Sequence, residues 1–167
     1  MKQSRRIALC GVLSALAVLV LLLGNLIGIG TYAAPLFAGL IIMPLGMKAG
    51  KKYHILGWLA VSLLGFMLLS DREEALMFAC LFGWYPIARP YFDSLRPPLN
   101  IISRFAALNA CAIAVELLVM LVLVPESAGV WLVIALLVLA NVTFIVYDRL
   151  IPVFMLLFLT RFSKFFK

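Results

Sequence analysis

Residues 109–125 read NACAIAVELLVMLVLVP, an unbroken apolar run with one carboxylate, Glu116, near its middle. In water such a run would form part of the core of a large domain. In a bilayer it would form a membrane-crossing helix, and a carboxylate at the helix centre would cost about 2.5–3.5 kcal/mol. The solvent that surrounds this run therefore decides the fold class.

The composition of the chain favours the bilayer. Hydrophobic residues make up 66% of the 167 residues and charged residues 13%, and the mean hydropathy is +1.17. A soluble domain contains about 45–50% apolar and about 25% charged residues. A chain this short could not bury so much apolar surface from water. The sequence therefore predicts an all-α, polytopic integral membrane protein.

The apolar stretches predict a six-transmembrane-helix bundle. A membrane helix needs about 20 apolar residues, and the candidate spans are 7–29, 33–47, 54–69, 75–88, 101–124 and 130–147. The first span is longer than the apolar region of a signal peptide, which has about 7–15 residues, so we expect it to be retained. No linker separates domains, so residues 1–167 form a single membrane domain.

The chain after residue 147 leaves two readings open. Residues 150–167 combine Pro152 with aromatic and basic side chains. This segment either forms a helix at the inner membrane interface, facing anionic lipids, or continues the last span as one tilted helix.

The basic residues predict the orientation. Thirteen of the fourteen Lys and Arg residues fall on one side of the six predicted spans, and only Arg72 falls on the other. Cytoplasmic loops carry such an excess, so we expect a multi-pass protein of the cell membrane with both termini in the cytoplasm. Asp71, Glu73, Glu74 and Glu126 then face outward.

Several functions are not expected. The net charge of +7 does not indicate a nucleic-acid partner, because the basic residues lie between apolar runs. The three cysteines lie in apolar runs with no ligand spacing, so we expect neither a disulfide nor a zinc site. His54, the only histidine, is expected at the cytoplasmic interface. We predict no enzyme, no metal and no cofactor.

Polar residues inside the predicted spans are the candidate functional groups, because such groups usually face the bundle interior or a cavity. Asn109 lies two helical turns before Glu116 on nearly the same face, and Asn141 lies in the last span. The asparagines either belong to a site or form interhelical hydrogen bonds. Glu116 either binds a ligand or a proton, or packs against Asn or Tyr partners.

A stripe of small residues marks the first span. Gly11 and Ala15 stand four residues apart in ALCGVLSALA, flanked by Ala8, Cys10 and Ser14. Such a stripe lets another helix approach closely. That helix belongs either to this chain or to a partner that docks near the cytoplasmic end.

The chain resembles the substrate-binding S components of energy-coupling factor (ECF) transporters. The resemblance rests on the basic N-terminus, the first span RRIALCGVLSALAVL, the six predicted helices and the short length. That family has an alanine-xxx-alanine motif in its first helix, and here Gly11 and Ala15 stand in its place. FGWYPIARP (82–90) and NVTFIVYDRL (141–150) resemble segments of small bacterial membrane proteins sometimes grouped with that family.

The resemblance implies uptake of a vitamin or similar micronutrient. Such a subunit binds its substrate outside, under the loop after the first helix, and works with a membrane coupling subunit and two cytoplasmic ATPases. Depth and polarity then place five residues by the pocket: Asn25, Tyr32, Met77, Glu116 and Trp131. Aromatic side chains would stack on a flat ligand and polar groups would orient it. Since the outer half has no histidine, an organic substrate fits better than nickel or cobalt.

Two other functions stay open. A structural or assembly protein of a cell-envelope complex would use the same stripe and need no outer pocket. A stand-alone ion- or proton-coupled carrier would use Glu116 as its coupling site, although the chain shows no internal repeat of the kind many carriers have. Within the loop RPYFDSLRPPLN (89–100), Arg89, Asp93 and Arg96 either anchor at lipid headgroups or touch a partner.

Overall fold

The computed structural model describes residues 3–27, 30–119, 130–158 and 160. All regular structure in these residues is helical, which confirms the all-α prediction for this part of the chain. The elements are α1 (Gln3–Ile27), α2 (Gly30–Lys48), α3 (Lys51–Leu68), α4 (Arg72–Met77), the π-helix η1 (Phe78–Phe82), α5 (Tyr85–Asp93), α6 (Leu99–Leu118) and α7 (Val130–Leu157).

Three helices in the described residues are long and apolar enough to cross a membrane. They are α1, α6 and the part of α7 from Ile134 to Leu157, and α2 adds a shorter apolar helix over Tyr32–Lys48. A bilayer core about 30 Å thick needs helices of this length. The structure therefore supports the predicted membrane association.

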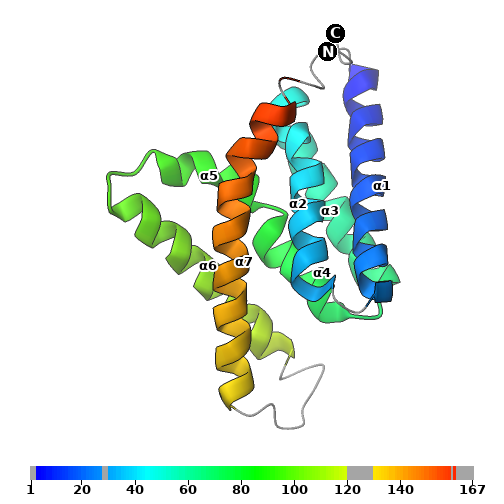
Figure 1. The fold of residues 1–167 in the computed structure, drawn as a ribbon. Helices are drawn as coiled ribbons and strands as arrows, with labels where there is room; N and C mark the ends of the chain where they lie inside the picture. Colours follow the sequence, from blue (N-terminus) through cyan, green and yellow to red (C-terminus); the bar gives the residue numbers. More distant parts are fainter. Residues whose placement is uncertain (1–2, 28–29, 120–129, 159, 161–167) are drawn as a thin grey trace.

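Helix α2 is the centre of the bundle. It contributes Ala38, Ile42 and Leu45 to a hydrophobic cluster with α1, α3 and α4, and Leu36 and Leu40 to a second cluster with η1, α6 and α7. A helix that contacts neighbours on several sides is apolar all round. Figure 1 shows α1, α2 and α3 side by side, with α7 next to α2 and with α5 and α6 to one side.

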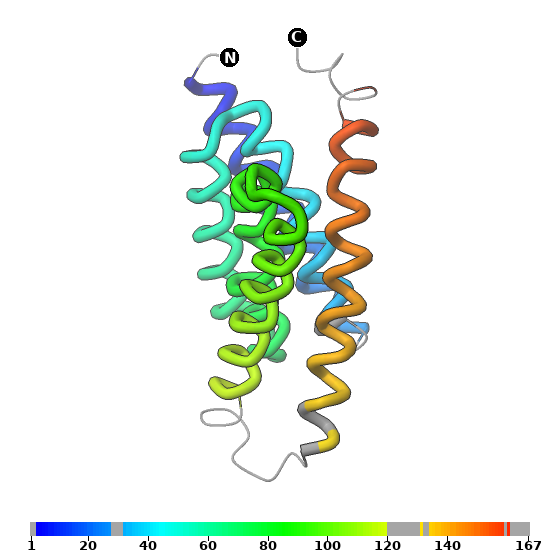
Figure 2. Tube along the Cα trace, turned by 90° about the vertical axis from the view of Figure 1, so that its left-hand side faces the viewer, coloured from blue at the N-terminus to red at the C-terminus, as the bar shows by residue number. Residues whose placement is uncertain are grey.

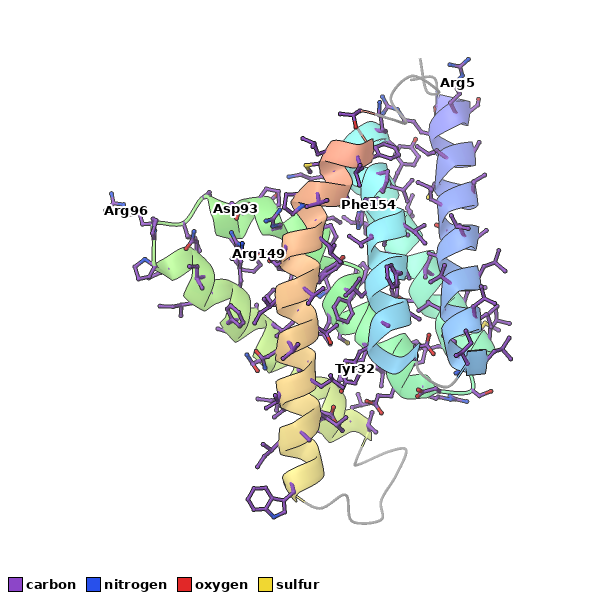
Figure 3. The ribbon with its side chains drawn as sticks, in the orientation of Figure 1. Arg5, Tyr32, Asp93, Arg96, Arg149 and Phe154 are labelled. Carbon is purple, nitrogen blue, oxygen red and sulfur yellow. The ribbon has the colours of Figure 1, made fainter. Side chains whose placement is uncertain are left out.

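The bundle has two ends that carry different residues. Figure 2 shows most of the helices running along one long direction. We call the end where α1 begins and α7 ends the proximal end, and the opposite end the distal end. Figure 3 places Arg5 and Phe154 toward the proximal end and Tyr32 toward the distal end.

The fourth apolar stretch differs from the predicted span over 75–88. The helix begins at Arg72, passes through η1, is interrupted at residues 83–84, and continues as α5 to Asp93 in a different direction (Figure 1). Gly83 is required at the break, because a Cβ atom there would clash with the Trp58 indole. Pro86 is tolerated because it lies in the first turn of α5.

Side chains from neighbouring helices bind the carbonyl groups at this break. The Trp58 indole donates to the Ala79 carbonyl oxygen at 3.0 Å, and the Tyr147 hydroxyl to that of Phe82 at 2.8 Å. His54 Nε2 lies 2.9 Å from the Gly83 carbonyl oxygen. Irregular backbone at membrane depth needs such partners. His54 is only 1% exposed, so it is buried between helices in the first turn of α3.

The last helix passes residue 147 without a break. Helix α7 is continuous to Leu157 and includes Pro152. Up to Leu157 the structure agrees with the prediction of one continuous helix, and not with a separate interfacial helix that begins at residue 150. Residues 161–167 of the predicted interfacial segment lie outside the described residues.

Candidate functional site

Tyr32 of α2, Glu73 of α4 and Glu116 of α6 lie together toward the distal end, and we call them the distal site. The Tyr32 hydroxyl donates a long hydrogen bond of 3.5 Å to Glu116 Oε1. Glu116 is 5% exposed and Tyr32 9%. The carboxylate of the fifth apolar run is therefore sheltered by the bundle, next to a phenol and a second carboxyl group.

The start of α4 positions the second carboxyl group. Asp71 caps this helix, and its Oδ1 accepts the backbone N–H groups of Glu73 at 3.0 Å and Glu74 at 3.4 Å. Acidic residues are favoured in the first turn of a helix because they face its positive end. Glu73 reaches the distal site, whereas Glu74 is completely buried next to Asn25 of α1.

A groove extends from the distal site between α2 and α7. Its volume is about 680 Å³, within the range of about 300–1,000 Å³ that is usual for small-molecule sites. Tyr32, Glu73 and Thr143 are its polar lining residues. The remaining lining is apolar: Ala33, Leu36, Phe37, Leu136, Leu139, Val142, Val146 and Leu150. The groove suits a ligand that is mostly apolar with one polar end.

The acidic residues at the distal end have perturbed proton affinities. Burial raises the pKa of Glu73 to about 7, and the neighbouring carboxyl groups of Glu116 and Asp71 add to the rise. Burial also raises the pKa of Glu74 to about 7, although a hydrogen bond with the Asn25 side chain lowers this pKa in part. Within the described residues, the ion pairs of Asp93 and Asp148 lie among α5, α6 and α7. Glu73, Glu74 and Glu116 form no ion pair with a Lys or Arg of these residues.

The structure brings together some of the five predicted site residues. Tyr32 and Glu116 are in contact. Met77 is fully buried in the same hydrophobic cluster as Tyr32 but does not line the groove. Asn25 lies beside Glu74. Trp131, at the distal start of α7, is 84% exposed and does not line the groove.

Glu73 and Glu74 were not among the site residues predicted from the sequence, because they fall in the outer loop between two predicted spans. The signal that could have found them is the order Asp71, Arg72, Glu73, Glu74, which is typical of a helix cap followed by an acidic first turn. A helix that begins at Arg72 puts Glu73 four residues before Met77 and on the same side.

The two intramembrane asparagines pair with each other. Asn109 Nδ2 donates to Asn141 Oδ1 at 3.1 Å, and Asn141 Nδ2 donates to Asn109 Oδ1 at 2.8 Å. This reciprocal pair joins α6 to α7. Of the two possibilities for the asparagines, it agrees with interhelical hydrogen bonding. Neither asparagine lines the groove next to the distal site.

The small-residue stripe of α1 divides between two sides of the helix. Cys10 and Ser14 face Gly57 of α3. Gly11 and Ala15 are exposed, and a Cβ atom added to Gly11 would have no atom within 4 Å. The half of the stripe that contains Gly11 and Ala15 is therefore not used for packing within the described chain.

Comparisons with known proteins identify no relative. No protein-family model, no curated protein and no solved structure matches this chain. In residues 3–27, 30–119, 130–158 and 160, no group of three or more His, Cys, Asp or Glu side chains could hold a metal ion.

Proposed function

We propose that this protein is the substrate-binding S component of an ECF-type uptake transporter that captures a small organic micronutrient from outside the cell. In this proposal the chain crosses the membrane six times, with the proximal end in the cytoplasm. A membrane coupling subunit and two cytoplasmic ATPases would be its partners.

The observation that carries the proposal is the groove lined by Glu73, a partly buried carboxyl group that lies beside the buried Glu116. A carboxyl group inside a bundle costs free energy unless something binds it. Glu73 and Glu116 make no ion pair within the described residues, and Glu73 lines the groove of about 680 Å³. A purely structural bundle would need no such site, so a ligand that enters the groove is the better explanation.

The chemistry of the groove favours one class of substrate. Glu73 lines the groove, and Glu116 contacts the lining residue Tyr32. Both carboxylates accept hydrogen bonds when they are ionised, so they suit a cationic or hydrogen-bond-donating group. The Tyr32 ring and the apolar lining between α2 and α7 suit a flat or hydrophobic body. We therefore expect an organic molecule with a positively charged end.

The exposed side of α1 supports the proposed partner. Gly11 and Ala15 lie on a surface of α1 without packing neighbours, at the position of the family's alanine-xxx-alanine motif. Small side chains allow the backbones of two membrane helices to come close. A helix of the coupling subunit would dock here, toward the proximal end.

The charge distribution supports the proposed orientation. Arg5 lies at the proximal end (Figure 3), and Lys48 and Lys51 lie where α2 ends and α3 begins, at the same end. Arg72 begins α4 at the distal end. An excess of basic residues marks the cytoplasmic side.

Ligand binding tests the proposal. The purified chain is screened against vitamins and related cationic micronutrients, because a ligand that binds only the folded form raises the melting temperature. For the ligand found, Glu73→Gln and Glu116→Gln should weaken binding by about tenfold or more, the effect of losing a hydrogen bond to a charged group. Asn141→Ala, which lies outside the groove, is the control. Unchanged affinity in both glutamine variants would contradict the proposed site.

Partner capture tests the transporter assignment separately. Affinity purification of the tagged chain should recover a coupling subunit and ATPases, and Gly11→Leu should abolish this recovery while the chain stays folded. Recovery of wall-synthesis proteins instead would favour an envelope-assembly function.

A proton-coupled carrier is the second candidate, and one observation favours it. The pKa of Glu73 is raised to about 7 by burial and by the carboxyl groups of Glu116 and Asp71, so this residue can exchange a proton near neutral pH. Uptake driven by a proton gradient in liposomes that contain only this protein would support the carrier and contradict the need for ATPases.

A further inference from the structure

A second cavity lies away from the distal site, between α5, α6 and α7. Its volume is about 620 Å³. Figure 1 shows that the end of α5 and the start of α6 extend away from α7. Its polar lining comes from all three helices: Arg89, Asn100, Arg104, Asp148 and Arg149.

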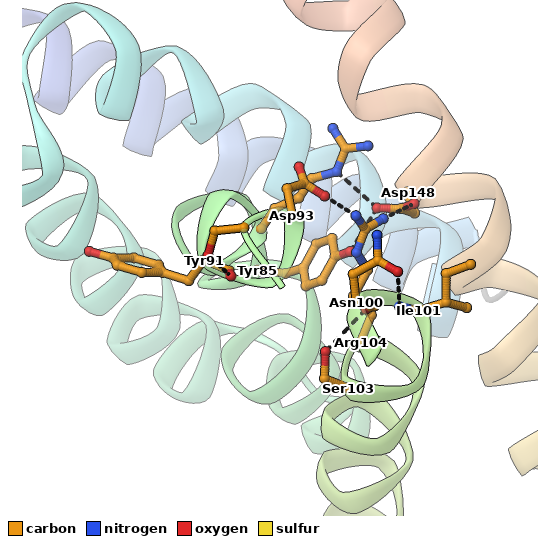
Figure 4. A network of polar contacts seen from close by, with 10 residues as sticks. Tyr85, Tyr91, Asp93, Asn100, Ile101, Ser103, Arg104 and Asp148 are labelled. Atoms are coloured by element: carbon orange, nitrogen blue, oxygen red, sulfur yellow. Dashed lines mark hydrogen bonds and ion pairs between the residues drawn. The ribbon is translucent and has the colours of Figure 1, made fainter. Parts of the chain in front are cut away.

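Asp148 holds two of the arginines in place. Its carboxylate accepts hydrogen bonds from the Tyr85 hydroxyl at 2.7 Å, from Arg89 Nε at 3.0 Å and from Arg104 Nη1 at 3.0 Å (Figure 4). Arg104 Nη2 also binds the carboxylate of Asp93. The Asp148 charge is therefore compensated, and the two guanidinium groups are fixed at the cavity wall.

The lining of the cavity has an excess of positive charge and N–H donors that are not used in hydrogen bonds within the described chain. Among the residues that the structure describes, three cationic side chains, Arg89, Arg104 and Arg149, line the cavity. The carboxylates of Asp93 and Asp148 pair with Arg89 and Arg104, so these five groups carry an excess of one positive charge. Each guanidinium has five N–H donors. Arg104 Nε is buried with no acceptor in the described residues, and Arg149 is exposed. This arrangement suits an anion with several acceptor oxygens.

The depth of the cavity matches the inner headgroup layer in the orientation proposed above. Asp148 follows Trp131 by seventeen residues, or about 26 Å at about 1.5 Å per residue. The hydrocarbon core is about 30 Å thick, and exposed tryptophans favour its boundary. Ile101 and Ile145 line the cavity and are 55% and 49% exposed, so they provide an apolar rim for an acyl chain.

We propose that this cavity binds a phosphate group, and that the phosphate belongs to an anionic phospholipid of the inner leaflet. Arg149 and the remaining N–H donors of Arg89 and Arg104 bind the phosphate oxygens in charge-assisted hydrogen bonds. The acyl chains lie against Ile101 and Ile145. The depth argument rests on the orientation given under the proposed function, but the binding chemistry does not depend on the transport activity.

Lipid binding in a neutral detergent tests the proposal, because no charged bilayer surface is then present. The full chain is titrated with phosphatidylglycerol or phosphatidylcholine, and bound lipid is measured by native mass spectrometry. We expect phosphatidylglycerol to bind at least about tenfold more tightly, and Arg149→Gln to lower this affinity about tenfold. Arg96→Gln removes the same charge from an exposed residue that does not line the cavity, so it should leave the affinity unchanged.

Additional measurements check that the variants fold and whether the bound phosphate belongs to a lipid. Thermal unfolding without lipid checks that each variant is folded, and Arg89→Gln provides a second variant, because Asp148 keeps its bond to Arg104. Equal binding of the two lipids, or equal losses in Arg149→Gln and Arg96→Gln, would overturn the proposal. Displacement of the lipid by glycerol phosphate at equal concentration would overturn the lipid assignment. Neither result bears on micronutrient binding at the distal site, which is measured separately.

Discussion

Glu73 is a residue whose ionisation should be visible in the stability of the folded protein. Its pKa is raised to about 7, from about 4.3 in an unfolded chain. The folded state therefore holds this proton more tightly than the unfolded state does. The resulting stabilisation is fully present below about pH 4.3 and is lost as the pH rises through about 7.

We therefore expect the melting temperature of the detergent-solubilised chain to fall between pH 5 and pH 8. Glu73→Gln should flatten this dependence, because glutamine does not ionise, and the double variant with Glu74→Gln should flatten it further. Thr143→Val, which alters the same groove without a titrating group, should keep the wild-type slope. A wild-type melting temperature that rises with pH over this range would contradict the burial of these carboxyl groups.

Tyr147 allows a single hydrogen bond at the helix break to be tested. Tyr147→Phe removes only the hydroxyl that donates to the Phe82 carbonyl oxygen at 2.8 Å, and it leaves a buried acceptor without its partner. We expect the free energy of unfolding to fall by about 1–3 kcal/mol, measured by denaturant titration in detergent.

Tyr91→Phe is the matched control for this substitution. Tyr91 is 59% exposed, and its hydroxyl accepts a hydrogen bond from Lys51 Nζ at the surface. Water can replace that partner, so a change within about 0.5 kcal/mol is expected. Equal losses in the two variants would show that the Phe82 carbonyl does not depend on Tyr147.

Among the helices, the packing of α2 against η1 and α7 depends on a glycine. A Cβ atom at Gly39 would lie 2.6 Å from the Tyr147 hydroxyl and 2.7 Å from the Phe82 carbonyl oxygen. Gly39→Ala should therefore destabilise the chain by about 1–3 kcal/mol, the usual effect of overpacking. Thermal unfolding measures the loss.

Gly11→Ala is the control, because Gly11 lies on a side of α1 that does not pack against the described residues. No atom lies within 4 Å of a Cβ atom at Gly11, and alanine favours a helix over glycine by about 1 kcal/mol. We expect unchanged or slightly increased stability. A loss as large as that of Gly39→Ala would mean that the α1 surface is packed against something within the chain.

For the whole molecule, the proposed orientation predicts which residues a membrane-impermeant maleimide reaches in intact cells. Cys10, Cys80 and Cys111 are first replaced by alanine. In this background Ser70→Cys, in the exposed connection between α3 and α4, should be labelled from outside. Arg96→Cys, in the exposed connection between α5 and α6, should be labelled only after the membrane is permeabilised. The reverse pattern would invert the orientation, and labelling of both from outside would contradict the six crossings.

The two ends of the bundle also differ in charge, and this difference could only partly be predicted. The basic bias of the loops was visible in the sequence, and it separates Arg72 from the other basic residues. The same bias did not indicate that Arg89 and Arg104 converge on Asp148. Asp148 is distant from both in the chain, and no local pattern marks it as their partner.

Composition by itself determined that the chain is helical and suited to a membrane. The free energy of transferring a segment into lipid is close to the sum of the contributions of its residues, so it can be read from the sequence. The same reasoning located the helices and singled out Glu116 as a residue that needs shelter. It did not determine the partners of Glu116, the break after η1, or the burial of His54. Lipid and protein interior are equally apolar, so hydrophobicity does not specify which side of a membrane helix faces a neighbour. Only the approach of α2, α4 and α6 brings Tyr32, Glu73 and Glu116 to one site.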